Sequence, residues 1–349
     1  TNSEERPLAR YDAIYDFLMP EEIPNDLHGH GTHVSSIIAS SDRTKKPYLY
    51  HGIAPSASLV SVRAFDENGV GTYPDVIRGI DWVVANKDTY NIRVLNLSFS
   101  APPQSYYWDD PLNQAVMRAW QEGIVVVAAA GNEGPDPMSI GVPGNVPYVI
   151  TVGAFSDNYT AEDRSDDFLT SFSSTGPTVE GFVKPDLLAP GGHMLGMMTN
   201  DATLAQTYPE FHESGNFFTM SGTSQSTAVT SGLVALMLQA DPTLSPDDVK
   251  CRLMDAARPA VDGQGNLAYS IFQQGAGMVN AYDAVYSSAA NCANQGLDIA
   301  KDLAGIEHYG GRANQDPTTG EYYIEGLDGY TWGDGYTWGD GYTWGCLLY

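Results

Sequence analysis

The segment DPLNQAVMRAWQEGIVVVAAA, residues 110–130, runs from a helical pattern straight into a buried strand. Pro111 suits the first turn of a helix, and Gly123 suits the left-handed residue that ends one. The run 124–130 is continuously apolar and rich in valine, which is typical of a strand covered on both faces. A helix that leads directly into such a strand predicts a crossover unit of a parallel sheet.

The same alternation of strand and helix extends over most of the chain. Valine-rich strand patterns bounded by Gly, Pro or Asn occur at 58–65, 93–99, 123–130 and 148–155. Helical patterns occur at 74–87, 110–123, 220–238 and 243–257, the last with Ser245 as an expected N-cap. The chain is therefore predicted to be α/β, with three layers: a mainly parallel β-sheet and helices on both of its faces.

The alternation stops near residue 288, so we predict two parts, 1–287 and a C-terminal extension, 288–349. The extension ends in DGYTWG written three times, residues 328–345. Because this period is even, an extended chain places the Tyr and Trp rings of all repeats on one face. Such a ladder suits stacking on a sheet, on sugar rings or on a neighbouring chain, and a low-complexity tether explains the repeat equally well.

Composition excludes several classes of protein. With 349 residues, 42% of them hydrophobic, the chain can bury a sizeable core. Its net charge of -26 disfavours nucleic acid and anionic lipid as partners. The apolar run 124–130 is far shorter than the roughly 20 residues that cross a bilayer, so no membrane span is expected. The chain opens at Thr1 without a basic and apolar leader, which indicates a processed or cut chain.

Three cysteines, Cys251, Cys292 and Cys346, lack C-x-x-C spacing, which disfavours a zinc site and is compatible with one disulfide and a leftover thiol. The stretch HGHGTHV, residues 28–34, holds three of the seven histidines. A zinc site would require a Glu between paired histidines or cysteines nearby, and neither is present. A catalytic base instead requires a nucleophile on a constrained turn and donors for an oxyanion.

Two further motifs supply those groups. The stretch MSGTSQSTAVTSGLVALML, residues 220–238, places Ser224 at the start of a long helix, where N–H groups favour developing negative charge. The stretch AAAGNEG, residues 128–134, offers the amide of Asn132 as an oxyanion donor. Each residue also has a plain structural interpretation: Ser224 as a helix cap, Asn132 as a turn residue and His30 as a loop residue.

Taken together and in this order, the three motifs resemble those of the subtilisin-like serine peptidases, the subtilases. The resemblance covers roughly residues 15–287 and includes the stretch 171–192 before the nucleophile motif. It implies His30 as general base, Ser224 as nucleophile and Asn132 as oxyanion donor, and it implies a structural role for His33. The resemblance also implies that an extended substrate pairs with two strands of the chain, at Leu97, Ser98, Phe99 and Ser100 and at Ala129, Ala130 and Gly131.

The chain departs from the family in one major respect. The family's third catalytic residue is an Asp in an Asp-Thr-Gly or Asp-Ser-Gly motif at the end of a strand, and neither tripeptide occurs here. Asp12, Asp16 and Asp26 precede His30, but none follows a buried apolar strand. We therefore expect that the first strand and its Asp belong to an N-terminal segment that was removed or that a separate fragment supplies. Lesser departures are Gln225 for Met, Ala228 for Pro and Ser100 for Gly.

The resemblance thus implies a secreted serine endopeptidase that forms an acyl-enzyme on Ser224 and needs no cofactor for its chemistry. Subtilases often bind structural calcium, so a site of carbonyl and carboxylate oxygens is expected, with ligands that the sequence does not assign. The expected partners are a protein or peptide substrate and a separate N-terminal fragment that carries the Asp. The alternative is an inactive subtilase-like scaffold that acts in interaction or assembly, with self-association or polymer binding through the aromatic tail.

Overall fold

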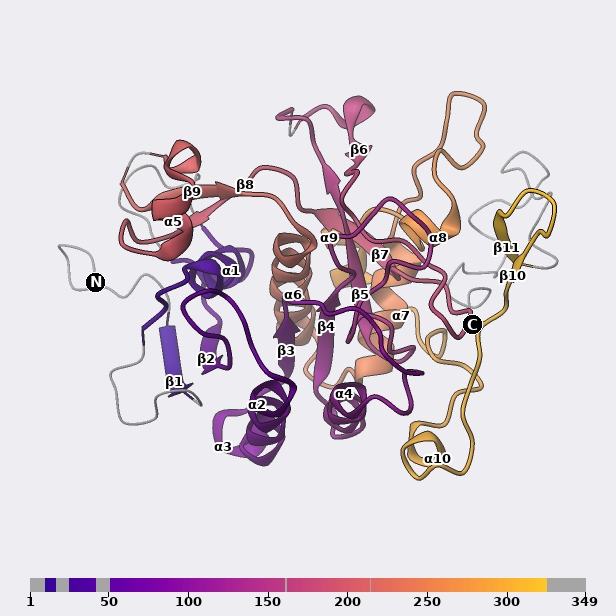
Figure 1. Ribbon diagram of the computed structural model, residues 1–349, viewed down its shortest axis with the longest axis horizontal. Coiled ribbons are helices and arrows are strands. Elements are labelled where there is room, and N and C mark those ends of the chain that lie inside the picture. Colours follow the sequence, from indigo (N-terminus) through magenta and orange to yellow (C-terminus); the bar gives the residue numbers. More distant parts are fainter. Residues whose placement is uncertain (1–9, 17–24, 42–50, 161, 214, 325–349) are drawn as a thin grey trace.

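The protein is described by a computed structural model over residues 10–16, 25–41, 51–160, 162–213 and 215–324 (Figure 1). The DGYTWG repeats and Cys346 lie outside these residues, so what the sequence predicts for them stays a prediction. The elements, in chain order, are β1 (Arg10–Asp16), α1 (His30–Ala39), β2 (Ser58–Arg63), α2 (Tyr73–Ala85), α3 (Lys87–Tyr90), β3 (Val94–Leu97), α4 (Pro111–Gln121), β4 (Val125–Ala129), β5 (Ile150–Ser156), η1 (Arg164–Asp166), β6 (Phe168–Leu169), β7 (Leu187–Pro190), β8 (Met194–Met197), α5 (Thr203–Thr207), η2 (Pro209–Phe211), β9 (Phe217–Met220), α6 (Thr223–Ala240), α7 (Pro246–Ala256), α8 (Ile271–Gln274), α9 (Ala281–Tyr286), α10 (Ile299–Leu303), β10 (Ala313–Gln315) and β11 (Tyr322–Ile324).

The central sheet is mainly parallel, as the sequence predicts. Strands β3, β4 and β5 run parallel in that order, with Val94 opposite Val125 and Val127 opposite Ile150. On the far side of β5 lie β7, which is parallel to it, and β6, which is antiparallel and pairs with its last residues. Every residue of β4 and β5 is buried, in agreement with their uninterrupted apolar sequences. The α/β class is thereby confirmed.

Two helices, α4 and α7, carry the end signals that the sequence predicts. Asp110 caps α4 by accepting hydrogen bonds from two backbone N–H groups, and Gly123 follows the helix with φ +84. A reciprocal pair of hydrogen bonds between Ser245 and Asp248 opens α7. Helix α6 packs against β3, β4, β5 and β7, whereas α4 packs against β4 and α2. Figure 1 shows α2 and α4 toward the viewer and α6 deeper in the molecule.

The sheet is discontinuous between β2 and β3. Strand β2 pairs in parallel with β1, strand β3 pairs with β4, and no described strand bridges the two sets. Figure 1 shows β1, β2, β3 and β4 in this order across the molecule. Helix α1 packs on β2 and on α6, which covers β3, so one helical layer spans both sets.

Residues 288–324 of the predicted extension are fastened to the rest of the chain. A disulfide joins Cys292 to Cys251 of α7. The carboxylate of Asp302 accepts a hydrogen bond from the buried Tyr107 hydroxyl at 2.6 Å. Ile324, at the end of β11, is 1% exposed in a small apolar cluster with residues of α7 and α8. The boundary at residue 288 stays a prediction, and the part of the extension that is described packs on the body.

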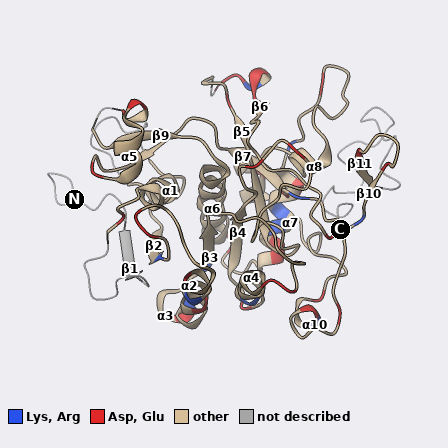
Figure 2. Ribbon diagram, viewed as in Figure 1, with Lys and Arg blue, Asp and Glu red and all other residues tan. Residues whose placement is uncertain are grey.

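Acidic side chains dominate the charged groups of the described chain. Figure 2 shows Asp and Glu distributed over loops and helix ends, including η1, and far fewer Lys and Arg. Among the described helices, none combines the length and the hydropathy that a bilayer crossing requires.

Candidate active site

Ser224 lies in the first turn of α6, an 18-residue helix whose N-cap is Gly222 and has no side-chain cap. The hydroxyl of Ser224 donates to the carbonyl oxygen of Ser98 at 3.1 Å, and the hydroxyl of Ser98 donates back to the carbonyl of Ser224 at 2.9 Å. The interpretation of Ser224 as a helix cap is therefore wrong. Its hydroxyl is held at a helix N-terminus, beside the end of β3.

Asn132 lies after β4 and is tied directly to the turn that carries Ser224. Its Oδ1 accepts hydrogen bonds from the backbone N–H of Thr223 at 2.9 Å and from the Thr223 hydroxyl at 3.0 Å. The Thr223 hydroxyl in turn accepts the N–H of Gly131 at 3.3 Å. Because Oδ1 is the acceptor, the amide N–H groups of Asn132 point away from Thr223 and are available to an oxyanion.

His30 is the first residue of α1 rather than a loop residue. The carboxylate of Asp26 fixes this helix start, because it accepts hydrogen bonds from Gly29 N–H at 2.8 Å and from Thr32 N–H at 2.6 Å. Burial, aided by nearby His28, lowers the pKa of His30 to about 4, and Asp26 opposes the shift. His30 is consequently neutral at pH 7 and able to accept a proton.

No carboxylate is hydrogen-bonded to a ring nitrogen of His30 among the residues whose side chains the structure describes, 25–41, 51–160, 162–213 and 215–324. The Asp26 oxygens are engaged at the helix start. The ring of His28 lies 6.2 Å from that of His30 and adds no negative charge. Ser224 donates to Ser98 instead of His30, which is compatible with a resting state because such contacts tighten in the substrate complex.

The residues predicted to bind substrate fall into two groups. Leu97 is buried in β3, whereas Ser98 and Phe99 are half-buried and Ser100 is exposed beyond the strand end. Phe99 and Ser100 make no main-chain hydrogen bond to any described residue, so their peptide groups are available to an extended ligand. The next residue, Ala101, pairs in both directions with Val142.

Ala129, Ala130 and Gly131 are buried, and most of their peptide groups are already bonded. Ala130 donates to Val152 at 3.0 Å and accepts from Gly141 at 2.9 Å, and the Gly131 carbonyl accepts from Ser174 at 3.0 Å. These residues therefore form the floor beneath the exposed strand end at Ser100. Sequence analysis assigns no role to Thr223, which orients Asn132, or to Asp26, which fixes the start of the helix that carries His30. The available signal was their position: Thr223 lies inside the serine motif, and Asp26 lies just before the histidine motif.

Comparison with known proteins identifies the family of this chain. Residues 2–278 match the model of the subtilase family, Peptidase_S8. The chain belongs to the subtilase family. It is 39% identical over 275 residues to serine protease AprX of Bacillus subtilis (strain 168), an alignment that covers 77% of this chain and 60% of AprX. It is 34% identical over 266 residues to subtilisin DY of Bacillus licheniformis, covering 76% of this chain and 80% of that one. The solved structure of a cold adapted subtilisin-like serine proteinase aligns with a TM-score of 0.54 and 30% identity, over 71% of this chain and 75% of that chain.

Calcium ligands are not identified in this subtilase. The described residues contain no group of three or more His, Cys, Asp or Glu side chains placed to hold a metal ion. One buried cluster of oxygens, the carbonyl of Pro147 and the carboxylate of Asp186, is instead occupied by lysines. Lys184 lies 2.6 Å and Lys250 3.2 Å from the Asp186 oxygens, and Lys250 donates to Pro147 at 2.7 Å. In this cluster, the lysine side chains contact the oxygens that a metal ion would need as ligands.

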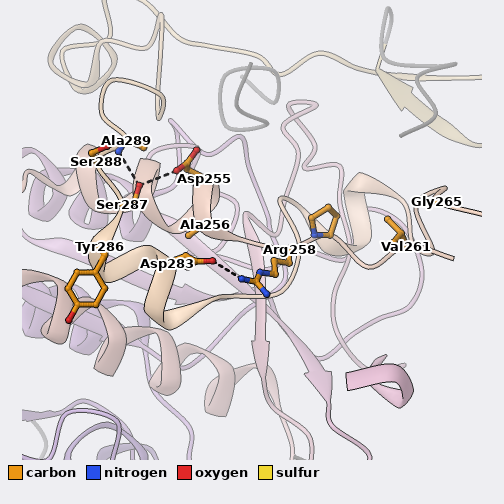
Figure 3. Close-up of a pocket in the computed structure, with 11 residues that line it drawn as sticks. Asp255, Ala256, Arg258, Val261, Gly265, Asp283, Tyr286, Ser287, Ser288 and Ala289 are labelled. Carbon is orange, nitrogen blue, oxygen red and sulfur yellow. Dashed lines mark hydrogen bonds and ion pairs between the residues drawn. The ribbon is translucent and has the colours of Figure 1, made fainter. Parts of the chain in front are cut away.

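A pocket elsewhere in this subtilase is separate from the catalytic residues. It lies between the end of α7, α9 and the segment 258–265, and Figure 3 shows an ion pair of Arg258 with Asp283 and a hydrogen bond of Ser287 with Asp255 in its walls. Arg258 is paired with Asp283 and Ser287 with Asp255, so we assign no catalytic role to these side chains.

Proposed function

We propose that this subtilase is a serine endopeptidase. Ser224 Oγ attacks the carbonyl carbon of the scissile peptide, and its proton passes to His30 and then to the leaving amine. Water then repeats the attack on the acyl-enzyme. The proposal is carried by one observation: the amide of Asn132, oriented by Thr223, lies next to the helix turn that presents Ser224. Similarity to serine protease AprX and to subtilisin DY supports the same activity, although the chain spans only 60% of AprX.

We propose that the substrate pairs with Ser98, Phe99 and Ser100 in extended form, above the floor of Ala129, Ala130 and Gly131. Support comes from the peptide groups of Phe99 and Ser100, which have no main-chain partner within the described part of the chain. Support also comes from the Ser98 carbonyl, which holds the nucleophile's hydroxyl before substrate arrives. Because main-chain pairing is independent of side chains, it positions the scissile bond and leaves specificity to the pockets around it.

We further propose that one more strand, carrying the catalytic Asp, pairs between β2 and β3. No described strand bridges β2 and β3, and both strands are mostly half-buried, whereas β4 and β5 are fully buried. Phe65 after β2 and Phe99 after β3 are in contact, with ring centroids 5.2 Å apart, so the two carboxyl ends lie within reach of each other.

The carboxyl end of such a strand would lie beside His30. The loop after β2 abuts the approach to α1, since a Cβ at Gly69 would come within 2.5 Å of the His28 ring. The segment after β3 holds Ser98, which contacts Ser224. Functional groups of parallel sheets gather at the carboxyl ends of strands, so an Asp at this position is placed to orient His30. A separate N-terminal fragment is the proposed source.

One observation favours the alternative of an inactive scaffold: among the residues whose side chains are described, from Asn25 onward, no carboxylate is hydrogen-bonded to His30. In that case the extension acts in assembly, through self-association or polymer binding by its DGYTWG repeats. Secretion is proposed for either function. The disulfide between Cys251 and Cys292 supports it, since such bonds persist in oxidising compartments, and one relative is named an extracellular serine proteinase.

The test is intact-mass analysis after treatment with a fluorophosphonate, which reacts with activated serines. We expect one adduct on Ser224, lost in Ser224→Ala and kept in Ser231→Ala, whose hydroxyl on the same helix bonds to Asn96 instead. A peptide with an Asp-Thr-Gly strand should accelerate labelling, and its Asn-Thr-Gly counterpart should not. Absence of an adduct with either peptide would move the scaffold function ahead.

A further inference from the structure

The residues next to the base and the nucleophile contact each other in the interior. His33 lies one turn beyond His30 on α1, and Gln225 follows Ser224 on α6. His33 is 0% exposed and Gln225 1% exposed. The Gln225 amide nitrogen lies 3.4 Å from His33 Nδ1, which makes this a direct side-chain contact between the two helices that carry the predicted catalytic residues.

The hydrogen-bonding roles in this contact are fixed by the other side of the imidazole. His33 Nε2 lies 3.0 Å from the carbonyl oxygen of Phe218 in β9, and a carbonyl only accepts, so Nε2 carries the proton. Burial lowers the pKa of His33 to about 4, which keeps the ring neutral at pH 7. Nδ1 is therefore a lone pair, and the amide N–H of Gln225 is its donor.

We propose that Gln225 is a positioning residue, and that its bond to His33 sets the placement of the base helix against the nucleophile helix. The chain of contacts runs from Phe218 of β9 through His33 to Gln225, which directly follows the nucleophile Ser224. This inference rests on the proposed peptidase function of His30 and Ser224. Since misplacement of a reacting group by 1 Å reduces rates by as much as about 10²-fold, a bond that fixes two helices controls the rate without touching substrate.

The surroundings leave this bond free of competing charge. The ionisable group that faces His33 is His30 of its own helix. From β8 and β9 the ring meets Met194 and Phe218, and from α6 it meets Gln225; none of these residues carries a charge. The other end of the Gln225 amide lies beside Gly222, where an added Cβ would come within 2.8 Å of Oε1, so a side chain at this position would displace the amide.

The test compares Gln225→Met with Gln274→Met. Methionine resembles glutamine in volume but has no N–H, and it is the usual residue of the family at this position, so Gln225→Met is expected to fold. Gln274 is also 0% exposed and donates to the carbonyl of Tyr269 at 2.6 Å, far from α1, so its replacement controls for the loss of a buried amide.

Gln225→Met should lower kcat for a chromogenic peptide by about tenfold with KM unchanged, because the strand end at Ser98 is untouched. An NMR titration adds a readout independent of activity. Without the amide donor, Nδ1 of His33 accepts a proton more readily, so His33 should titrate at higher pH in Gln225→Met, and the ring signals of His30 should shift. Gln274→Met should change none of these.

Unchanged titration of His33 in Gln225→Met would show that the bond does not exist. A changed His33 titration with unchanged His30 signals and unchanged kcat would overturn the positioning role. Should the parent protein not react with the fluorophosphonate even when the Asp-Thr-Gly peptide is present, the peptidase function fails, and the His30 signals alone then decide whether Gln225 positions the base.

Discussion

Acidification should destabilise this subtilase through His33, and the size of the effect follows from burial. The ring is 0% exposed, and its pKa is lowered from 6.5 to about 4. In the unfolded chain the same histidine binds a proton at its ordinary pKa. Between these two values the unfolded state holds more protons than the folded state, so stability rises with pH. The contribution of His33 is complete above pH 6.5 and is lost as pH falls toward 4.

The magnitude is about 3 kcal/mol, since one pKa unit corresponds to about 1.4 kcal/mol and the shift is from 6.5 to about 4. The assay is urea unfolding at several pH values between about 7 and about 4, in a Ser224→Ala background that prevents self-cleavage. Replacement of His33 by Leu should flatten the pH dependence by about 1.4 kcal/mol per pH unit in this window.

The matched control is His193→Leu, which removes a histidine on the exposed surface. His30 acts in the same direction as His33, because burial lowers its pKa to about 4 as well, so some pH dependence persists in His33→Leu. If His33→Leu and the parent lose stability in parallel as the pH falls, the linkage to His33 is refuted.

Three further substitutions test the contacts that hold the site. Thr223→Val removes the hydroxyl that orients Asn132, and kcat for a chromogenic peptide should fall about tenfold, less than the 10²–10³-fold of losing an oxyanion donor outright; unchanged kcat would contradict the oriented amide. Asp26→Ala removes the carboxylate at the start of α1, and thermal unfolding should show a loss of about 1–2 kcal/mol, with slower labelling because His30 begins this helix. Asp302→Asn places an amide against the two tyrosine hydroxyls that donate to the carboxylate, and proteolysis within residues 288–324 should increase as stability falls by about 2 kcal/mol.

The strands that the sequence predicts are those with continuous valine-rich runs. Residues 123–130 and 148–155 become β4 and β5, each entirely buried, so composition alone identifies them. Strand β1 was not predicted, because RYDAIYD mixes charged and apolar residues without such a run. The hairpin of β8 and β9 was also missed, since its strands are four residues long and their pairing joins segments separated by a helix.

The motifs predict which residues form the site but not how their side chains are oriented. A serine at a helix start is locally indistinguishable from a cap, and only the position of Gly222 at the N-cap separates the two roles of Ser224. The Asn132 amide is oriented by Thr223, 91 residues away along the chain. Such long-range hydrogen bonds depend on how β4 and α6 pack together, which local patterns of sequence do not encode.

The break between β2 and β3 links stability and activity in one structural feature. A strand seated there would pair with two edges whose backbone groups otherwise face solvent, and it would cover apolar side chains that β2 and β3 leave half-buried. The same strand would end beside His30, so covering the edges and completing the catalytic residues are one event. A segment that carries Asn in place of Asp should therefore still stabilise the fold, because sheet pairing does not require the carboxylate. The same segment should fail to activate Ser224. Replacement of this one Asp by Asn should therefore abolish labelling of Ser224 and leave the stability gain unchanged, as expected of a strand that is both structural and catalytic.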